Sequence, residues 1–114
     1  MALGPGSLIT VPFPFTDLSG AKSRPALVLL VHGDDLLVCG VTSKLSGRRD
    51  AVPLDTDDLV EGRLPKRSEI RPLKLFTIHR SLVRSVVGRV THETLGRTVG
   101  ILTTSLAHGR RVGD

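Results

Sequence analysis

The hydrophobic pattern is clearest in the middle of the chain, where two apolar runs flank a short polar turn. The first run, residues 25–31, follows Arg24, and after a turn at 32–35 the second run, residues 36–41, ends in the polar triplet 42–44. Unbroken runs of this length, rich in Val and Leu and bounded by turns, are typical of buried strands. The pattern therefore predicts a central β-hairpin.

The register of this hairpin decides which polar residues meet at its open end. With a four-residue loop, Val31 pairs with Leu36. That register places Arg24 opposite Ser43, and a three-residue loop places it opposite Thr42 instead. In both cases an arginine faces a hydroxyl, with opposed Cβ atoms about 5 Å apart. The alternative interpretation is that the arginine is a solvated edge residue and the hydroxyls merely end a strand.

The rest of the chain alternates short apolar segments with turn residues, and only its last part has a helical period. Strands are predicted at residues 8–11, 51–54, 68–78 and 85–90, a proline-rich loop at 12–22 and a capped helical turn at 55–62. From the N-cap Thr91 to Gly109, the spacing predicts a helix whose apolar stripe is Leu95, Val99, Leu102 and Leu106. The fold class is mostly β (α+β): one domain over residues 1–114, a small bent antiparallel barrel with a C-terminal helix.

Charge adds a candidate binding surface to this picture. The 114 residues carry a net charge of +5. Much of the excess lies in one basic segment, which contains Arg63, Lys66, Arg67, Arg71, Lys74, Arg80, Arg84 and Arg89 and only one acid, Glu69. Such a segment favours phosphates or an acidic partner. The alternative is a solvated basic face without a partner.

Composition also excludes several classes of site. The single cysteine, Cys39, lies within an apolar run, so no disulfide or paired-cysteine metal site forms within one chain. No carboxylate cluster or closely spaced histidine pair suggests a metal, and we expect neither a metal nor a cofactor. The chain has no apolar run of about 20 residues and no signal-peptide pattern, which predicts a cytoplasmic protein without a membrane segment.

Five motifs, taken together, resemble the MazF/PemK toxins over nearly the whole chain. In order along the sequence they are residues 11–17 (VPFPFTD), 24–29 (RPALVL), 41–43 (VTS), 64–68 (LPKRS) and 73–78 (LKLFTI). The most specific parts are the proline-phenylalanine loop that leads into Arg-Pro-Ala and the Thr-Ser that ends the next strand. Two departures are Ser7, where the family usually has an acid, and His79-Arg80, where an acid followed by lysine is more usual.

The resemblance implies a sequence-specific endoribonuclease with an SH3-like barrel that forms a homodimer. It also implies that the protein is the toxin of a type II toxin–antitoxin pair, whose antitoxin is similar to a DNA-binding dimer with an acidic, disordered tail. In that family the catalytic pair corresponds to Arg24 and Thr42. We expect support for single-stranded RNA binding and the transition state from Ser43, Lys22, Asp17, Ser19, Lys74 and His79.

The chemistry implied by this resemblance needs no metal, because RNA supplies its own nucleophile, the 2′-OH. A guanidinium fork suits the stabilisation of charge on phosphorus, whereas its pKa above about 12 makes arginine a poor base. The candidate proton acceptors are His79 and Asp17.

Two rival functions remain at this point. A gyrase-poisoning toxin of the CcdB type has the same fold but uses an apolar C-terminus, whereas this chain ends in RRVGD. A non-catalytic nucleic-acid-binding barrel would use the basic segment as a phosphate track and would bind without cutting.

Overall fold

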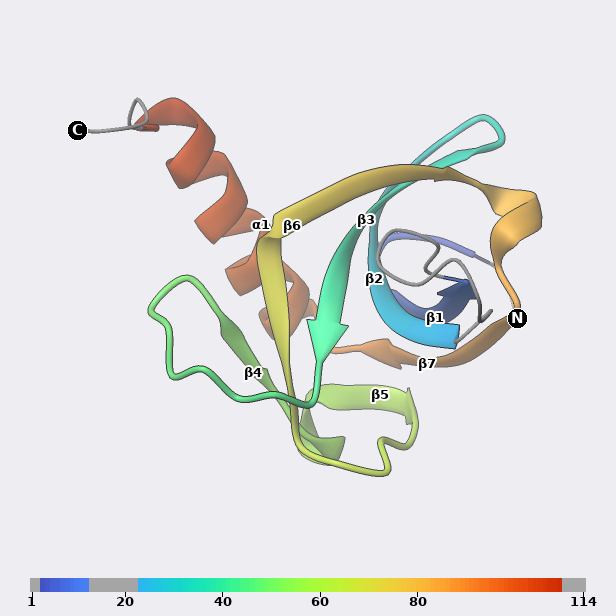
Figure 1. Ribbon diagram of the computed structural model, residues 1–114, viewed down its shortest axis with the longest axis horizontal. Coiled ribbons are helices and arrows are strands. Elements are labelled where there is room, and N and C mark those ends of the chain that lie inside the picture. The colour runs from blue at the N-terminus through green and yellow to red at the C-terminus, as the bar shows by residue number, and fades with distance from the viewer. Residues whose placement is uncertain (1–2, 13–22, 110–114) are drawn as a thin grey trace.

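The computed structural model describes residues 3–12 and 23–109, and within them it forms a seven-stranded antiparallel sheet with one α-helix (Figure 1). In chain order the elements are β1 (Ser7–Pro12), β2 (Ser23–His32), β3 (Asp35–Thr42), β4 (Val52–Leu54), the 3₁₀ turn η1 (Thr56–Asp58), β5 (Leu59–Gly62), β6 (Ser68–His79), the 3₁₀ turn η2 (Arg80–Leu82), β7 (Ser85–Val90) and α1 (His92–Ala107). None of the helices in the described ranges combines the length and hydrophobicity needed to span a bilayer.

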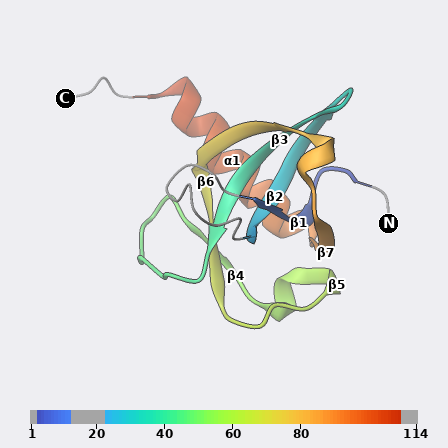
Figure 2. The same cartoon turned by 45° about the vertical axis from the view of Figure 1, so that its right-hand side comes forward.

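The strand order across the sheet is β4-β6-β3-β2-β1-β7-β5, and every neighbouring pair is antiparallel. The sheet curls into a half-barrel, so that β7 and β1 lie across from β6 in Figure 1, while α1 packs against β6 and β4. The view in Figure 2 shows α1 behind the central strands. This arrangement confirms the predicted mostly β fold with a C-terminal helix.

Alternation along the strands divides the core into two clusters on opposite faces of the sheet. The helix face carries Leu8, Leu27, Cys39, Val41 and Ile70, which pack with Leu102 of α1. The other face, called the front face below, carries Ile9, Val11, Ala26, Val28, Leu36 and Val38. Because successive side chains point to opposite faces, these clusters fix the face on which each polar residue of the same strands lies.

The predicted helical turn at 55–62 is correct only in its first half. Asp55 caps η1 through a reciprocal pair of hydrogen bonds with Asp58, as in a capping box. The chain then becomes β5, which pairs with β7. Gly62 has φ +86°, and a Cβ on it would lie 2.0 Å from the carbonyl oxygen of Val87. This close backbone approach explains the glycine as part of a strand pair rather than as a helix end.

The helix starts as predicted, but it buries a different face. The Thr91 hydroxyl accepts a hydrogen bond from the Thr94 N–H at 3.2 Å, which confirms the N-cap. The buried residues are Thr94, Thr98 and Leu102, whereas Leu106 is 70% exposed and Val99 is at the surface. Thr98 tolerates burial because its hydroxyl donates to the Thr94 carbonyl at 2.9 Å. The predicted apolar stripe is therefore correct at Leu102 and wrong at Val99 and Leu106.

Candidate functional site

A β-bulge in the central hairpin sets the register at its open end. Val31 pairs with Leu36, as predicted, although the ladder closes further, to His32 and Asp35. Between Val28 and Leu30 the register shifts by one residue, so that Ala26 pairs with Gly40. Continued by two residues, this register brings Arg24 level with Thr42 rather than Ser43. The bulge thus decides between the two alignments that the sequence left open.

Arg24 and Thr42 also share a face. Arg24 pairs with Val11 of β1, which belongs to the front-face cluster, so the arginine side chain lies on the front face. Thr42 is four residues after Val38 in β3 and lies on the same face. Arg24 is exposed and Thr42 half-buried. An anion on the front face can therefore reach both residues.

The Thr42 hydroxyl has a defined role in the turn that follows β3. Its Oγ1 accepts a hydrogen bond from the Lys44 N–H at 3.1 Å. Since the hydroxyl acts as an acceptor there, its own hydrogen stays available to donate to a ligand. Ser43, between the two, is exposed.

Two further cations reach the same end of the sheet. The β3–β6 register shifts between Cys39, opposite Leu75, and Gly40, opposite Arg71, so that β6 bulges at residues 72–74. A Cβ added to Gly40 would meet the Lys74 side chain at 3.3 Å, which places that lysine over the front face of β3. Arg84, just before β7, donates to the Ser23 hydroxyl at 3.1 Å.

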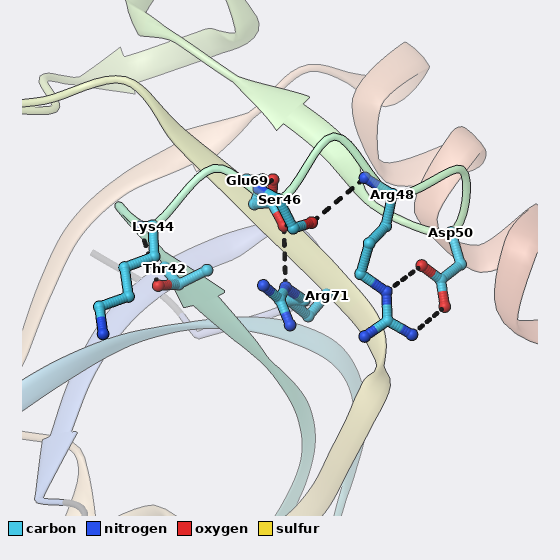
Figure 3. A network of polar contacts seen from close by, with 7 residues as sticks. All are labelled: Thr42, Lys44, Ser46, Arg48, Asp50, Glu69 and Arg71. Carbon is cyan, nitrogen blue, oxygen red and sulfur yellow. Dashed lines mark hydrogen bonds and ion pairs between the residues drawn. The ribbon is translucent and has the colours of Figure 1, made fainter.

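A buried carboxylate, which we did not predict as a site residue, lies beside these cations. Glu69 pairs with Thr42 across β3 and β6 and is only 4% exposed. It accepts three hydrogen bonds, each at 2.8 Å: from the Ser46 N–H, the Ser46 hydroxyl and Arg71 Nε (Figure 3). Its position as the only acid of the basic segment is the one signal in the sequence that could have identified it.

The hydrogen bonds of Glu69 keep it ionised. The Ser46 backbone N–H is the largest cause that lowers the pKa of Glu69 from its usual 4.5. Burial acts in the opposite direction, while the Ser46 hydroxyl and the Arg71 guanidinium lower the pKa further. The site therefore holds a fixed negative charge, which is paired with the Arg71 guanidinium and hydrogen-bonded by Ser46.

A cavity of about 300 Å³ opens beside Glu69. It is lined by Glu69 and by residues of the loop before β4, of β4 itself and around the start of β6: Leu45, Gly47, Arg48, Ala51, Pro53, Arg67 and Ser68. Arg48 pairs with Asp50 through two hydrogen bonds of 3.0 and 3.1 Å (Figure 3). This pair is local to the loop between β3 and β4.

His79, which was also predicted for the site, lies far from Thr42 along the sheet. His79 pairs with Asp35 at the opposite end of β3 from Thr42, a separation of about 23 Å at the usual rise per residue. Its Nδ1 accepts from the Ser81 N–H at 3.1 Å and caps η2. The remaining three, Asp17, Ser19 and Lys22, lie outside the described residues.

The basic segment is less one-sided in space than in sequence, because acids from elsewhere meet it. Arg67 lies 3.6 Å from Asp55, and Arg89 lies 3.1 Å from Glu61. Both pairs are exposed, so they reduce the local charge without fixing the geometry strongly.

Over residues 3–12 and 23–109, no three His, Cys, Asp or Glu side chains converge as metal ligands.

Ser7, one of the two departures noted in the sequence, is buried, and its hydroxyl accepts a hydrogen bond from the Gly4 N–H at 3.1 Å. It closes the turn that leads into β1.

One family model matches the chain, over residues 5–106, and it is described as the PemK-like, MazF-like toxin of type II toxin–antitoxin systems. No curated protein sequence matches at a significant level.

Solved structures with the same fold include several toxins. A MazE–MazF crystal structure from Deinococcus radiodurans is 22% identical, with a TM-score of 0.75, over 94% of this chain and 98% of that one. The toxin MazF-mt6 from Mycobacterium tuberculosis is 18% identical, with a TM-score of 0.70, over 89% and 96%. A mycobacterial endoribonuclease in complex with its cognate antitoxin is also 18% identical, with a TM-score of 0.73, over 96% and 100%.

Proposed function

We propose a function from one premise: the chain belongs to the PemK-like, MazF-like toxin family of type II toxin–antitoxin systems. On that premise it is a sequence-specific endoribonuclease that cuts single-stranded RNA through the RNA's own 2′-OH. Arg24 and Thr42 are its catalytic residues. The proposal assigns no step to a metal or cofactor.

The observation that carries this proposal is the register of the central hairpin. The bulge between Val28 and Leu30 brings Arg24 level with Thr42, and both side chains lie on the front face. Strands that are hydrogen-bonded hold opposed residues about 5 Å apart, so a phosphate bound there meets a guanidinium and a hydroxyl together.

The chemistry divides into three tasks: removal of the 2′-OH proton, stabilisation of charge on the phosphate, and protonation of the leaving 5′-oxygen. Arg24 performs the second task, because a fixed guanidinium can donate two parallel hydrogen bonds to phosphate oxygens as their charge grows. Thr42 donates to the same group, since its hydroxyl hydrogen is not used in the turn to Lys44. Lys74 and Ser43 add donors at the rim of the site.

The partners follow from the same premise. We propose a cytoplasmic homodimer. Its support is the exposure, between 37% and 52%, of three leucines on β2 and β6 that a partner subunit could cover: Leu30, Leu73 and Leu75. We also propose a cognate antitoxin with an acidic tail. Support comes from the similar mycobacterial endoribonuclease that was solved in complex with its cognate antitoxin, from the similar MazE–MazF structure and from the net charge of +5.

The experiment is cleavage of a long RNA by the pure protein, with the new 5′ ends mapped to find the preferred site. A short RNA with that site is then compared with the same oligonucleotide carrying a single 2′-deoxyribose at the scissile position. We expect the first to be cut, with or without EDTA, and the second to stay intact. Cleavage of the deoxy substrate, or a loss of activity in EDTA, would contradict the proposed route.

A further inference from the structure

Glu69 is the most constrained charged group in the described part of the chain. It lies in register with Thr42, is almost fully buried and accepts three hydrogen bonds of 2.8 Å. A buried charge is costly unless it is paired and hydrogen-bonded, and the pairing here is complete. The catalytic roles proposed above do not use it.

The carboxylate ties the turn after Thr42 to a neighbouring strand. The Lys44 N–H donates to Thr42 at 3.1 Å, and the Arg48 N–H donates to the Ser46 hydroxyl at 3.2 Å. These bonds are local to the loop. The two bonds from Ser46 to Glu69, by contrast, anchor the loop to β6. Because Ser46 is four residues after Thr42, this anchor limits how the end of β3 can move.

The same carboxylate also holds Arg71. The guanidinium gives its Nε–H to Glu69 Oε2 (Figure 3). Within the described ranges Glu69 is the only hydrogen-bond partner of the Arg71 side chain, which is 27% exposed. Arg71 is opposite Gly40, on the front face. A planar group fixed at one edge can bind an anion at its other edge with little further loss of freedom.

We infer that Glu69 is a positioning residue of the RNA-cleaving site and that Arg71, which it orients, binds a second backbone phosphate of the RNA. The inference rests on the proposed function. Arg24 and Arg71 lie on β2 and β6, on either side of β3, so their backbones are about 10 Å apart. At this spacing the two guanidinium groups can contact different phosphates of one strand.

The competing interpretation is that the pair only stabilises the sheet. A matched control is available in Glu61, which pairs with Arg89 at 3.1 Å on β5 and β7. Replacement of Glu61 by Gln changes the same charge in an exposed pair. For the arginine, the control is Arg97, an exposed residue of α1.

The test measures kcat and KM on the mapped RNA for the wild type, Glu69→Gln, Arg71→Ala, Glu61→Gln and Arg97→Ala, at a temperature where each is folded by circular dichroism. In Glu69→Gln an NH₂ replaces one acceptor oxygen and faces a donor, so we expect kcat to fall about tenfold or more. In Arg71→Ala we expect KM to rise about tenfold. In the same variant, the slope of log(1/KM) against the logarithm of the salt concentration should become less steep by about 0.7, the value for one phosphate of a single strand. The two controls should match the wild type.

The remaining outcomes would overturn either the proposed function or the roles of Glu69 and Arg71 alone. If the wild type leaves RNA intact, the proposed function fails and this inference fails with it. If the wild type cuts RNA and both site variants keep its kcat, KM and salt slope, only the inference is overturned. It is also overturned if the controls lose as much as the site variants. If Glu69→Gln does not fold, Ser46→Ala removes one of the three bonds to the carboxylate, and a rate equal to that of the wild type would refute the positioning role.

Discussion

Both ends of β3 have polar side chains around them, but the contacts that fix these side chains differ between the two ends. At the Asp35 end, His32, Asp35 and His79 are exposed, and the described hydrogen bonds of the His79 side chain go to Ser81 in the adjoining 3₁₀ turn. At the Thr42 end, a buried carboxylate links β6 to the loop after β3, and bulges in β2 and β6 adjust which residues meet. Polar residues alone therefore do not identify a site. The Thr42 end differs in the long-range contacts that fix the geometry of its polar residues.

The strongest test of this comparison is removal of the hairpin pair at the Thr42 end. We expect Arg24→Ala and Thr42→Ala each to slow RNA cleavage by about 10²-fold or more, the usual effect of losing a preorganised donor to a developing charge. Both residues are at the surface end of their strands, so folding should persist. Single-turnover cleavage rates measure the effect, with circular dichroism as the control for folding. Full activity in either variant would refute its catalytic role.

Replacement by alanine should lower the free energy of unfolding more at the buried Glu69 than at the exposed Glu61. Glu69→Ala leaves Ser46 and Arg71 without their acceptor, and we expect a loss of about 1–3 kcal/mol in the free energy of unfolding. Glu61→Ala removes an exposed partner of Arg89 and should cost less than about 1 kcal/mol. Urea denaturation of both variants measures the difference. Equal losses would mean that burial of Glu69 adds no constraint.

The contribution of Glu69 to the free energy of unfolding should also depend on pH. Because the pKa of Glu69 is lowered from 4.5 in the folded protein, its contribution to stability is complete above that value and is lost as the pH falls through the folded-state pKa. The stability difference between the wild type and Glu69→Gln should therefore shrink between pH 7 and about pH 3. Urea denaturation at both pH values, with Glu61→Gln as the reference, tests this. A difference that stays constant would argue against the charge as its source.

The sequence was sufficient to predict the strands of the hairpin but not the register of its open end. Residues 26–31 are all apolar, so nothing in their order marks the position of the bulge. The extra residue is accommodated by the curl of the sheet, which depends on strands far away in the chain. Both registers therefore stayed open until the pairing of Ala26 with Gly40 was known.

The buried groups were the hardest to predict, because their burial depends on neighbours from other segments. Glu69 looked like a lone acid in a basic segment, and only the loop that brings Ser46 over it makes it part of a site. The helix was similar: leucines suggested one stripe, but Thr98 could enter the core once its hydroxyl bonded to Thr94. Periodicity indicates the element, and hydrogen bonding decides which polar residues it can bury.

The smallest effect is expected at the Asp35 end. His79→Ala should change the cleavage rate by less than about twofold, because about 23 Å of β3 separates His79 from Thr42. The loss of the η2 cap should cost about 1 kcal/mol of stability at most. Cleavage rates across the pH range in which histidine titrates provide the measurement. A large loss, with a changed pH profile, would mean that His79 reaches the reaction from the second copy of a homodimer, and the contrast between the two ends of β3 would then hold only within one chain.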